Sequence, residues 1–364
     1  MKKILSVLII TLLLTLPAAT FAQKGGFGEI KQLQSPQNPR IGFVIHGGAG
    51  VIKRGSLSPE KEAAYRKQLE EAVLAGYKAL QDGKTSLDAV EIAIRMLEDS
   101  PLFNAGKGAV FTHDGINELD ASIMNGKTLA AGAVAGLHKV KNPITLARAV
   151  MEKSPHVMMI GDGAEKFAAE QKIELVDPKY FFTQERWDDL QKILEREKAN
   201  SPKPQVPSPK SEDKKQNPKS AIPNPKSEKY GTVGAVALDK DGNLAAGTST
   251  GGMTNKRYGR VGDVPVIGAG TYANNDSCAV SATGWGEFFI RVGVARDISA
   301  LMEYSALPVQ NAADRTLAKV KALGGDGGVI AMDKFGNIGI SFNSEGMYRA
   351  YIGSDGKPVV EIYK

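Results

Sequence analysis

At Gly231-Thr-Val-Gly-Ala-Val-Ala-Leu-Asp239 the chain changes character, because a tract rich in Lys, Pro and Ser ends and an apolar run typical of a buried strand begins. Thr232 stands at this junction. A Thr inside a chain is a poor nucleophile, since nothing beside it takes the proton of its hydroxyl. At a new N-terminus the α-amine of Thr232, with a pKa of about 7.7–8.0, becomes a base within reach of that hydroxyl. The alternative is that Thr232 only opens a β-strand.

The first 22 residues have the three parts of a secretory signal peptide. Two lysines precede an apolar run over residues 4–16, which is too short to span a bilayer comfortably. Thr20 and Ala22 are small residues at the −3 and −1 positions of a cleavage before Gln23. We therefore predict a periplasmic or secreted protein with no membrane attachment once the leader (1–22) is removed. An uncleaved N-terminal membrane anchor is the alternative.

The net charge of +6 misleads about binding partners. Two of these charges belong to the leader and four to residues 201–230, where seven lysines face three acidic residues. The rest of the chain carries no net charge, which gives no support to nucleic-acid binding. Cys278 is the single cysteine, so no internal disulfide holds the fold. The core has to be large enough alone, which the roughly 340 residues that follow the leader allow.

Composition divides the chain into a leader, a lead-in and two halves joined by a linker. Residues 23–40 are polar and predict a flexible lead-in. Residues 201–230 hold seven of the eighteen prolines and few apolar side chains, which predicts a disordered linker over 200–230. The halves 41–231 and 232–364 are expected to form one domain, 41–364. The second half is too rich in glycine and too short of helix to cover both faces of its own sheet.

Periodicity and capping signals predict helices and hairpins in both halves. A buried strand is expected at Ile41–His46, and helices at 59–80, from Ser86, and around 143–153, 162–171 and 183–198. After Thr232, two similar hairpins turn at Gly242-Asn243 and Gly336-Asn337. Between them, helices are expected from near Gly286 and over 309–323. Sheets covered by helices predict a layered α+β fold.

Other catalytic motifs fail on the order or number of their residues. Gly247-Thr-Ser-Thr-Gly251 matches the nucleophile elbow of α/β-hydrolases, which needs a His after its Ser. All four His precede Ser249, and Cys278 has none downstream either. The His also lack metal-ligand spacing, and His46, beside glycines at a strand end, suits a structural role better than a ligand. Gly268-Ala-Gly270 resembles a dinucleotide loop, but an apolar run follows it instead of a helix.

Two short motifs after Thr232 could support a hydrolytic site. Arg260-Val-Gly-Asp263 sets a guanidinium and a carboxylate in a Gly-flanked loop. Together they would recognise the carboxylate and the ammonium group of a free α-amino acid. Thr283-Gly284 lies between a strand and a helix, where a hydroxyl and a backbone N–H can point at a developing oxyanion. A surface ion pair and an ordinary turn are the respective alternatives.

Six sequence blocks, in order, resemble those of the plant-type L-asparaginases, also called isoaspartyl peptidases, which are N-terminal nucleophile (Ntn) hydrolases. The blocks are His46-Gly-Gly-Ala-Gly50, Pro101-Leu-Phe-Asn-Ala-Gly106, Gly231-Thr-Val-Gly-Ala-Val-Ala237, Thr248-Ser-Thr-Gly-Gly-Met-Thr-Asn255, Gly259-Arg-Val-Gly-Asp263 and Phe342-Asn-Ser-Glu-Gly-Met347. The resemblance runs from about residue 41 to about residue 350, interrupted only by the linker.

This resemblance implies a four-layer αββα sandwich of the Ntn-hydrolase type, with two mainly antiparallel sheets between helical layers. It also implies autocleavage at Gly231-Thr232, giving an α subunit (41–231) and a β subunit (232–364) that assemble as an (αβ)2 heterotetramer. The implied reaction is hydrolysis of L-asparagine and β-aspartyl dipeptides by Thr232, with no cofactor required for catalysis.

The resemblance also assigns roles by position. Thr250 would hydrogen-bond the nucleophile, Arg260 would hold the substrate α-carboxylate and Asp263 its α-amine. Thr283 and Gly284 would form the oxyanion hole. A structural Na+ would be coordinated by main-chain oxygens of a loop. Its residues are Leu97, Glu98, Ser100, Phe103, Ala105 and Lys107.

Gly231 separates branches of the implied superfamily, because glycosylasparaginases and taspase-like proteases usually carry Asp before the nucleophile. It therefore favours the isoaspartyl branch. Glycosylasparaginase stays open as the nearest enzyme alternative. From another class, a non-catalytic exported amino-acid-binding protein would use Arg260 and Asp263 without chemistry.

Overall fold

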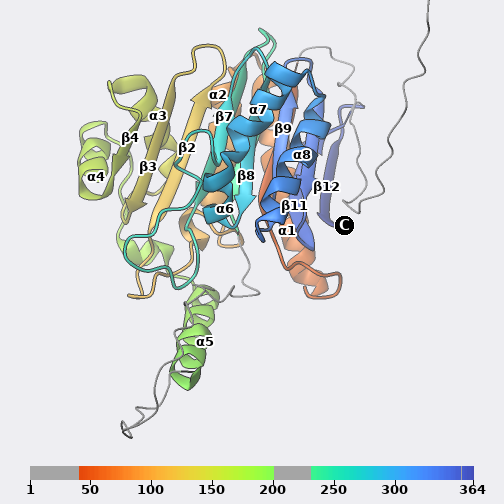
Figure 1. Ribbon diagram of the computed structural model, residues 1–364. Helices are drawn as coiled ribbons and strands as arrows, with labels where there is room; N and C mark the ends of the chain where they lie inside the picture. Colours follow the sequence, from red (N-terminus) through yellow and green to blue (C-terminus); the bar gives the residue numbers. More distant parts are fainter. Residues whose placement is uncertain (1–40, 201–230, 354) are drawn as a thin grey trace, which may run out of the picture.

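The computed structural model describes residues 41–200, 231–353 and 355–364. The expected signal peptide, lead-in and linker lie outside these ranges. The fold is α+β, as predicted, with one sheet of eight strands and one of four, flanked by helices (Figure 1). None of the helices in the described ranges is long and apolar enough to cross a membrane.

The larger sheet combines strands from both halves of the chain. In spatial order they are β12 (Pro358–Tyr363), β11 (Gly346–Ile352), β1 (Gly42–Gly50), β5 (Val233–Leu238), β6 (Leu244–Thr250), β2 (Leu119–Asn125), β3 (Ala131–Leu137) and β4 (Met158–Ile160). Among these pairs only β3–β4 is parallel, so the sheet is mixed. β1 precedes Gly231 in sequence, yet it lies between β5 and β11, which both follow it.

The smaller sheet is antiparallel and packs face to face on the larger one. Its strands, in order, are β10 (Ile338–Phe342), β9 (Gly327–Asp333), β8 (Cys278–Gly284) and β7 (Thr271–Ala273). β8 and β9 contact β1 and β5 across the interface between the sheets. Residues of alternate parity on β1 therefore enter different cores: Phe43 and Ile45 face the helices, whereas Val44 lies between the sheets.

Helices cover the outer face of each sheet. The larger sheet is covered by α1 (Pro59–Gln81), α2 (Ser86–Glu98) and α3 (Pro143–Lys153), and the smaller sheet by α7 (Val294–Ser305) and α8 (Val309–Ala322) (Figure 1). The remaining helical segments are α4 (Gly161–Glu170), α5 (Gln184–Asn200), α6 (Gly286–Val292) and the short 3-10 turns Gly106–Gly108 and Pro178–Phe181. α4 packs beside β3 and β4 at one edge of the larger sheet.

The two predicted hairpins are present as β5–β6 and β9–β10. In each, an aspartate where the first strand ends accepts two backbone N–H groups of the turn: Asp239 in the first and Asp333 in the second. Gly242 and Gly336 close these turns with φ of 80° and 83°, which favour glycine.

The single helix expected from near Gly286 is in fact two helices. Gly293 has a φ of 65° and donates its N–H to the carbonyls of Phe289 and Ile290, which ends α6. α7 then starts at Val294. The apolar pattern continues across Gly293, so periodicity alone did not reveal the break.

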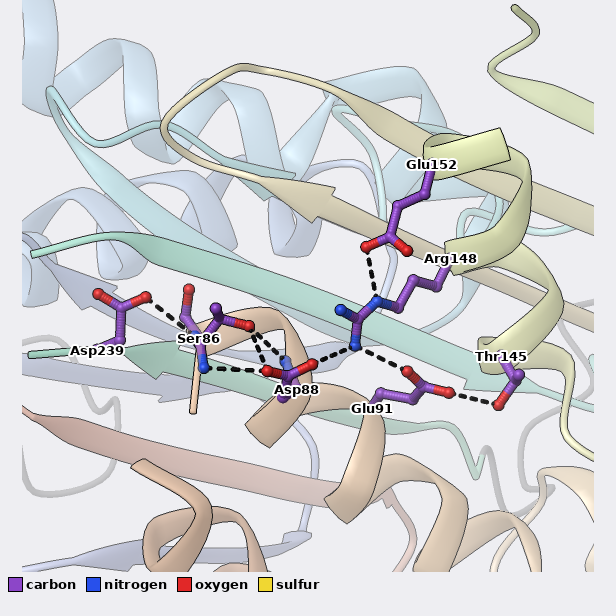
Figure 2. Close-up of polar contacts among 8 residues, drawn as sticks. Ser86, Asp88, Glu91, Thr145, Arg148, Glu152 and Asp239 are labelled. Atoms are coloured by element: carbon purple, nitrogen blue, oxygen red, sulfur yellow. Dashed lines mark hydrogen bonds and ion pairs between the residues drawn. The ribbon is translucent and has the colours of Figure 1, made fainter. Parts of the chain in front are cut away.

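The start of α2 is tied to the β5–β6 turn and to α3 (Figure 2). Thr85 and Asp88 form a capping box, and Asp239 accepts the N–H of Ser86 over 3.0 Å. Arg148 of α3 donates to Asp88 over 2.7 Å. The hairpin that begins at Val233 is thereby fixed against the helical layer.

Candidate active site

Thr232 is buried immediately before β5, and β5 pairs with β6 so that Thr250 lies beside it. The Thr232 hydroxyl donates to the Thr250 hydroxyl over 3.2 Å. Thr250 donates in turn to the carbonyl oxygen of Gly231 over 3.3 Å and accepts the N–H of Gly252. The Thr250 hydroxyl thus accepts a hydrogen bond from Thr232 and donates one to the carbonyl that precedes Thr232.

Asn104 is a candidate functional residue to which the sequence analysis gave no role. Its side-chain amide donates to the Gly252 carbonyl over 2.7 Å, and its side-chain oxygen accepts the N–H of Val110. Gly231 packs so tightly on Asn104 that a Cβ on Gly231 would lie 2.7 Å from the Asn104 Cβ. The one indication of a role for Asn104 in the sequence was that it belongs to the Pro101–Gly106 block of the family resemblance.

His46 supports Thr232 from within the core, in keeping with the structural role expected of it. It is fully buried, with Nδ1 3.0 Å from the Thr232 carbonyl oxygen and Nε2 2.9 Å from the Ser281 hydroxyl. Burial lowers the pKa of His46 to about 3, against the opposing effect of the hydrogen bond to Thr232. The ring is therefore neutral, so Nδ1–H donates to the carbonyl and Nε2 accepts from Ser281.

Ser281 belongs to a line of buried hydroxyls between the sheets. Thr248 lies 2.7 Å from Ser281, Thr271 lies 2.5 Å from Thr248, and Ser122 donates to Thr271 over 2.8 Å. The line ends where Ser122 contacts the carbonyl of Val264, the residue after Asp263. It connects the support of Thr232 with the Arg260–Asp263 loop, and no sequence motif indicated it.

Arg260 and Asp263 line the same pocket as Thr232, Thr250 and Gly284. Asp263 is buried, and its Oδ2 has no hydrogen-bond partner within the described ranges. Burial raises the pKa of Asp263 to about 7, although the charge of Arg260 opposes this. A buried carboxylate oxygen facing a pocket without a donor is suited to receive a cation.

Glu287, in the first turn of α6, orients Arg260. Its carboxylate accepts from Nε and Nη2 of Arg260, both over 2.9 Å. Burial would raise the pKa of Glu287, but the hydrogen bonds and charge of Arg260 outweigh it and lower the pKa below its usual value. Glu287 thus binds the edge of the guanidinium formed by Nε and Nη2. The end-on edge, formed by Nη1 and Nη2, can bind another carboxylate.

Thr283 and Gly284 occupy the end of β8, but only Gly284 lines the pocket. The Thr283 hydroxyl is buried and accepts the N–H of Ala49, in the glycine-rich end of β1, over 3.3 Å. Gly284 has a φ of 154°, and a Cβ there would lie 2.5 Å from the Asp326 carbonyl oxygen. Gly284 therefore lines the pocket, whereas the Thr283 hydroxyl is turned to the backbone of β1.

In the loop proposed from the resemblance to hold Na+, two glycines lie against backbone carbonyls. A Cβ on Gly106 would lie 2.3 Å from the Glu98 carbonyl oxygen, and one on Gly108 would lie 2.1 Å from that of Phe103. Carbonyl oxygens suit a hard monovalent cation. Leu97 lies at the end of α2, whereas Ser100, Ala105 and Lys107 lie in the loop itself, with only Lys107 partly exposed. The carbonyls of Leu97, Phe103 and Ala105 each accept a backbone N–H group, from Ser100, Ala105 and Gly108 respectively.

Ser249 and Cys278 lie away from the pocket. Ser249 is fully buried and donates to the Glu98 carboxylate over 2.6 Å, so it faces the helical layer. Cys278 is fully buried, and burial raises the pKa of its thiol to about 12. Both observations agree with the rejection of a serine elbow and of a cysteine nucleophile.

The pocket therefore combines a buried hydroxyl, a guanidinium and a carboxylate, which is a set suited to hydrolysing an amide of an amino acid. The chain matches the protein-family model described as Asparaginase over residues 39–362. It belongs to this family.

This chain matches its relatives over nearly the whole of their length. An isoaspartyl peptidase of Salmonella typhimurium is 51% identical over 323 residues, which are 88% of this chain and 98% of the relative. An isoaspartyl peptidase of Escherichia coli is 50% identical over 323 residues, covering 88% and 96%. A plant-type L-asparaginase of Pyrococcus abyssi is 42% identical over 315 residues, covering 86% and 96%.

Proposed function

We propose that this protein is a self-processing hydrolase that cleaves β-aspartyl dipeptides and L-asparagine. The names of its relatives support this activity. The observation that carries the proposal is the Thr232–Thr250–Gly231 arrangement, because it sets one hydroxyl against the carbonyl that would have to be cut.

Maturation begins with attack of Thr232 Oγ on the carbonyl carbon of Gly231. The bond from this carbon to the Thr232 nitrogen breaks, and the nitrogen takes up a proton, so the amide becomes an ester. Water hydrolyses the ester, which frees the Gly231 carboxylate and restores the Thr232 hydroxyl. The hydrogen bond from Thr250 to the Gly231 carbonyl favours attack by stabilising the charge that develops on that oxygen.

In turnover the new α-amine of Thr232 takes the hydroxyl proton as Oγ attacks the side-chain carbonyl of the aspartyl unit. Ammonia or an amino acid leaves with that proton, and water then hydrolyses the β-aspartyl ester. Arg260 holds the α-carboxylate through its end-on edge and Asp263 holds the α-amine. The Gly284 N–H, with Thr283 behind it, serves the oxyanion.

We also propose a finer description of the fold, the assembly and the location of the protein, which membership of this family supports. The two helical layers and two sheets form an αββα sandwich of the Ntn-hydrolase type, built from an α subunit (41–231) and a β subunit (232–364) that pair as (αβ)2. Leu97, Glu98, Ser100, Phe103, Ala105 and Lys107 supply main-chain oxygens to a structural Na+, and catalysis requires no cofactor. The leader exports the protein to a periplasm or the medium.

Substrate comparison tests the function. The purified protein is expected to release amino acids from β-aspartyl dipeptides and ammonia from L-asparagine, and to leave glycosyl-asparagine almost untouched. Preference for glycosyl-asparagine would establish the glycosylasparaginase alternative. Binding of L-aspartate without hydrolysis of any of the three substrates would establish the amino-acid-binding alternative.

A further inference from the structure

A second pocket shares Gly231 with the Arg260–Asp263 pocket. Gly231 and Asn104 form one wall, and the aromatic side chains of Tyr65, Phe103 and Tyr348 line the interior. The Tyr65 and Tyr348 rings stack at 4.3 Å between centroids, and Phe103 packs edge-on against Tyr65. Arg186 is the one charged residue that lines this pocket in the described part of the chain.

Arg186 is an unusual residue for such a place. It is 8% exposed, and it stands in the first turn of α5, where the helix dipole disfavours a cation. Its Nε donates to the Gly108 carbonyl over 3.1 Å and its Nη2 to the Leu102 carbonyl over 3.4 Å. Within the described ranges no carboxylate forms an ion pair with Arg186. A buried cation without a counter-ion is unfavourable unless an anion binds beside it.

The direction in which the leaving group departs points to this pocket. The α-amine of Thr232 must lie within hydrogen-bond reach of the leaving nitrogen to return the proton. That amine is the nitrogen now bonded to Gly231, and Gly231 forms the wall of the pocket. The amino acid released from a β-aspartyl dipeptide therefore extends from the Arg260–Asp263 pocket past Thr232 toward Arg186.

We propose that Arg186 and its pocket bind the amino acid on the leaving side of β-aspartyl dipeptides. The guanidinium holds the α-carboxylate, and Tyr65, Phe103 and Tyr348 hold an apolar side chain. This proposal rests on the proposed function, since it concerns the second half of the same substrate. The Gly231 carboxylate freed by maturation is the competing source of the anion.

The test compares three substrates on the matured wild-type protein: β-aspartyl-leucine, the same compound with its C-terminal carboxylate converted to an amide, and L-asparagine. A charge-assisted hydrogen bond predicts a kcat/KM about 10- to 100-fold higher for the free acid than for the amide. Equal kcat/KM values for acid and amide would overturn the proposal. They are also the result expected if the Gly231 carboxylate fills the site.

Arg186→Met assigns the effect to this residue. The variant is expected to lose most of the preference for the free acid and to retain its activity on L-asparagine, which has no leaving-group carboxylate. Lys192→Met removes one positive charge from the same helix at an exposed position and serves as the matched control. It should keep the preference. A preference that survives in Arg186→Met would contradict the assignment.

Activity on L-asparagine separates this proposal from the function itself. If neither L-asparagine nor the dipeptide is hydrolysed by the wild type, the proposed function fails. If L-asparagine is hydrolysed but the acid and amide forms are equivalent, only the leaving-group site fails. Even if Arg186→Met does not fold or mature, equal kcat/KM values for the acid and the amide in the wild type still overturn the proposal.

Discussion

The contact between Gly231 and Asn104 leaves no room for a side chain at position 231. A Cβ at this position would lie 2.7 Å from the Cβ of Asn104 and 3.2 Å from its backbone nitrogen, so any side chain has to push the Asn104 loop away. Asn104 also fixes Gly252, which donates to Thr250. A displacement here would therefore reach the hydroxyl that polarises the Gly231 carbonyl.

Gly231→Ala is expected to slow maturation by about tenfold or more, because strain at Asn104 shifts the carbonyl from Thr250. A time course on a denaturing gel measures the rate. Gly163→Ala is the control, since no atom lies within 4 Å of a Cβ there. Maturation of Gly231→Ala at the wild-type rate would show that the contact does not matter.

The pKa of Asp263 gives a pH dependence with a definite sign. Burial raises this pKa to about 7, and only the ionised carboxylate attracts the ammonium group of the ligand. The affinity for L-aspartate should therefore fall as the pH drops below about 7, by up to about tenfold per pH unit. Calorimetric titrations across this range measure it.

Asp263→Asn is the matched variant for that titration. It should bind L-aspartate weakly and lose the dependence near pH 7. A wild-type affinity that stays constant between about pH 5 and pH 8 would show that Asp263 is not the group that meets the amine.

At the scale of elements, the Arg148 cluster joins α2 to α3 (Figure 2). Arg148 donates to Asp88 over 2.7 Å and to Glu91 over 2.9 Å, and also to Glu152 within its own helix. The Arg148 side chain is 20% exposed, whereas that of Glu152 is 41% exposed. The bonds between the helices should thus contribute more than the one within α3.

Arg148→Met is expected to lower the free energy of unfolding by about 1–3 kcal/mol, because Asp88 and Glu91 are left without their partner. Glu152→Gln should change it by less than about 0.5 kcal/mol. Urea denaturation of both on a Thr232→Ala background, where the chain is expected to stay uncut, gives a unimolecular comparison. Equal effects of the two substitutions would refute this account of the cluster.

Helices and hairpins were predictable because their signals are local. Ser58 and Pro59 mark the start of α1, and Asp239 and Gly242 mark a turn, within a few residues of each other. Contacts between residues far apart in the sequence have no such local signal. Asn104 meets Gly252 across 148 positions and His46 meets Ser281 across 235, so their roles depended on the folded chain.

At the scale of the whole molecule, the sheet order determines what a cut at Gly231-Thr232 would do. β1 pairs with β5 on one side and β11 on the other, so the two halves share a ladder of backbone hydrogen bonds and a common core. The sequence indicated that residues 232–364 have too little helix to cover both faces of their own sheet. The order of the strands in the sheet could not be predicted from the sequence.

The two chains of the matured protein should therefore stay together without denaturant. Size-exclusion chromatography is expected to give a single species of about twice the mass of one αβ unit, and denaturing electrophoresis of that peak should give two bands. Separation of the two chains in native buffer would contradict the shared sheet. A native mass of one αβ unit would contradict the (αβ)2 assembly alone.

The central claim is that Thr232 becomes the nucleophile by cutting the chain before itself. Intact-mass measurement with N-terminal sequencing of the purified protein tests it most directly. Two chains are predicted, one starting at Thr232, with Thr232→Ala remaining a single chain and Thr232→Ser cutting more slowly. A wild-type protein that stays uncut yet hydrolyses L-asparagine, or a Thr232→Ala variant that is fully cut, would contradict the account.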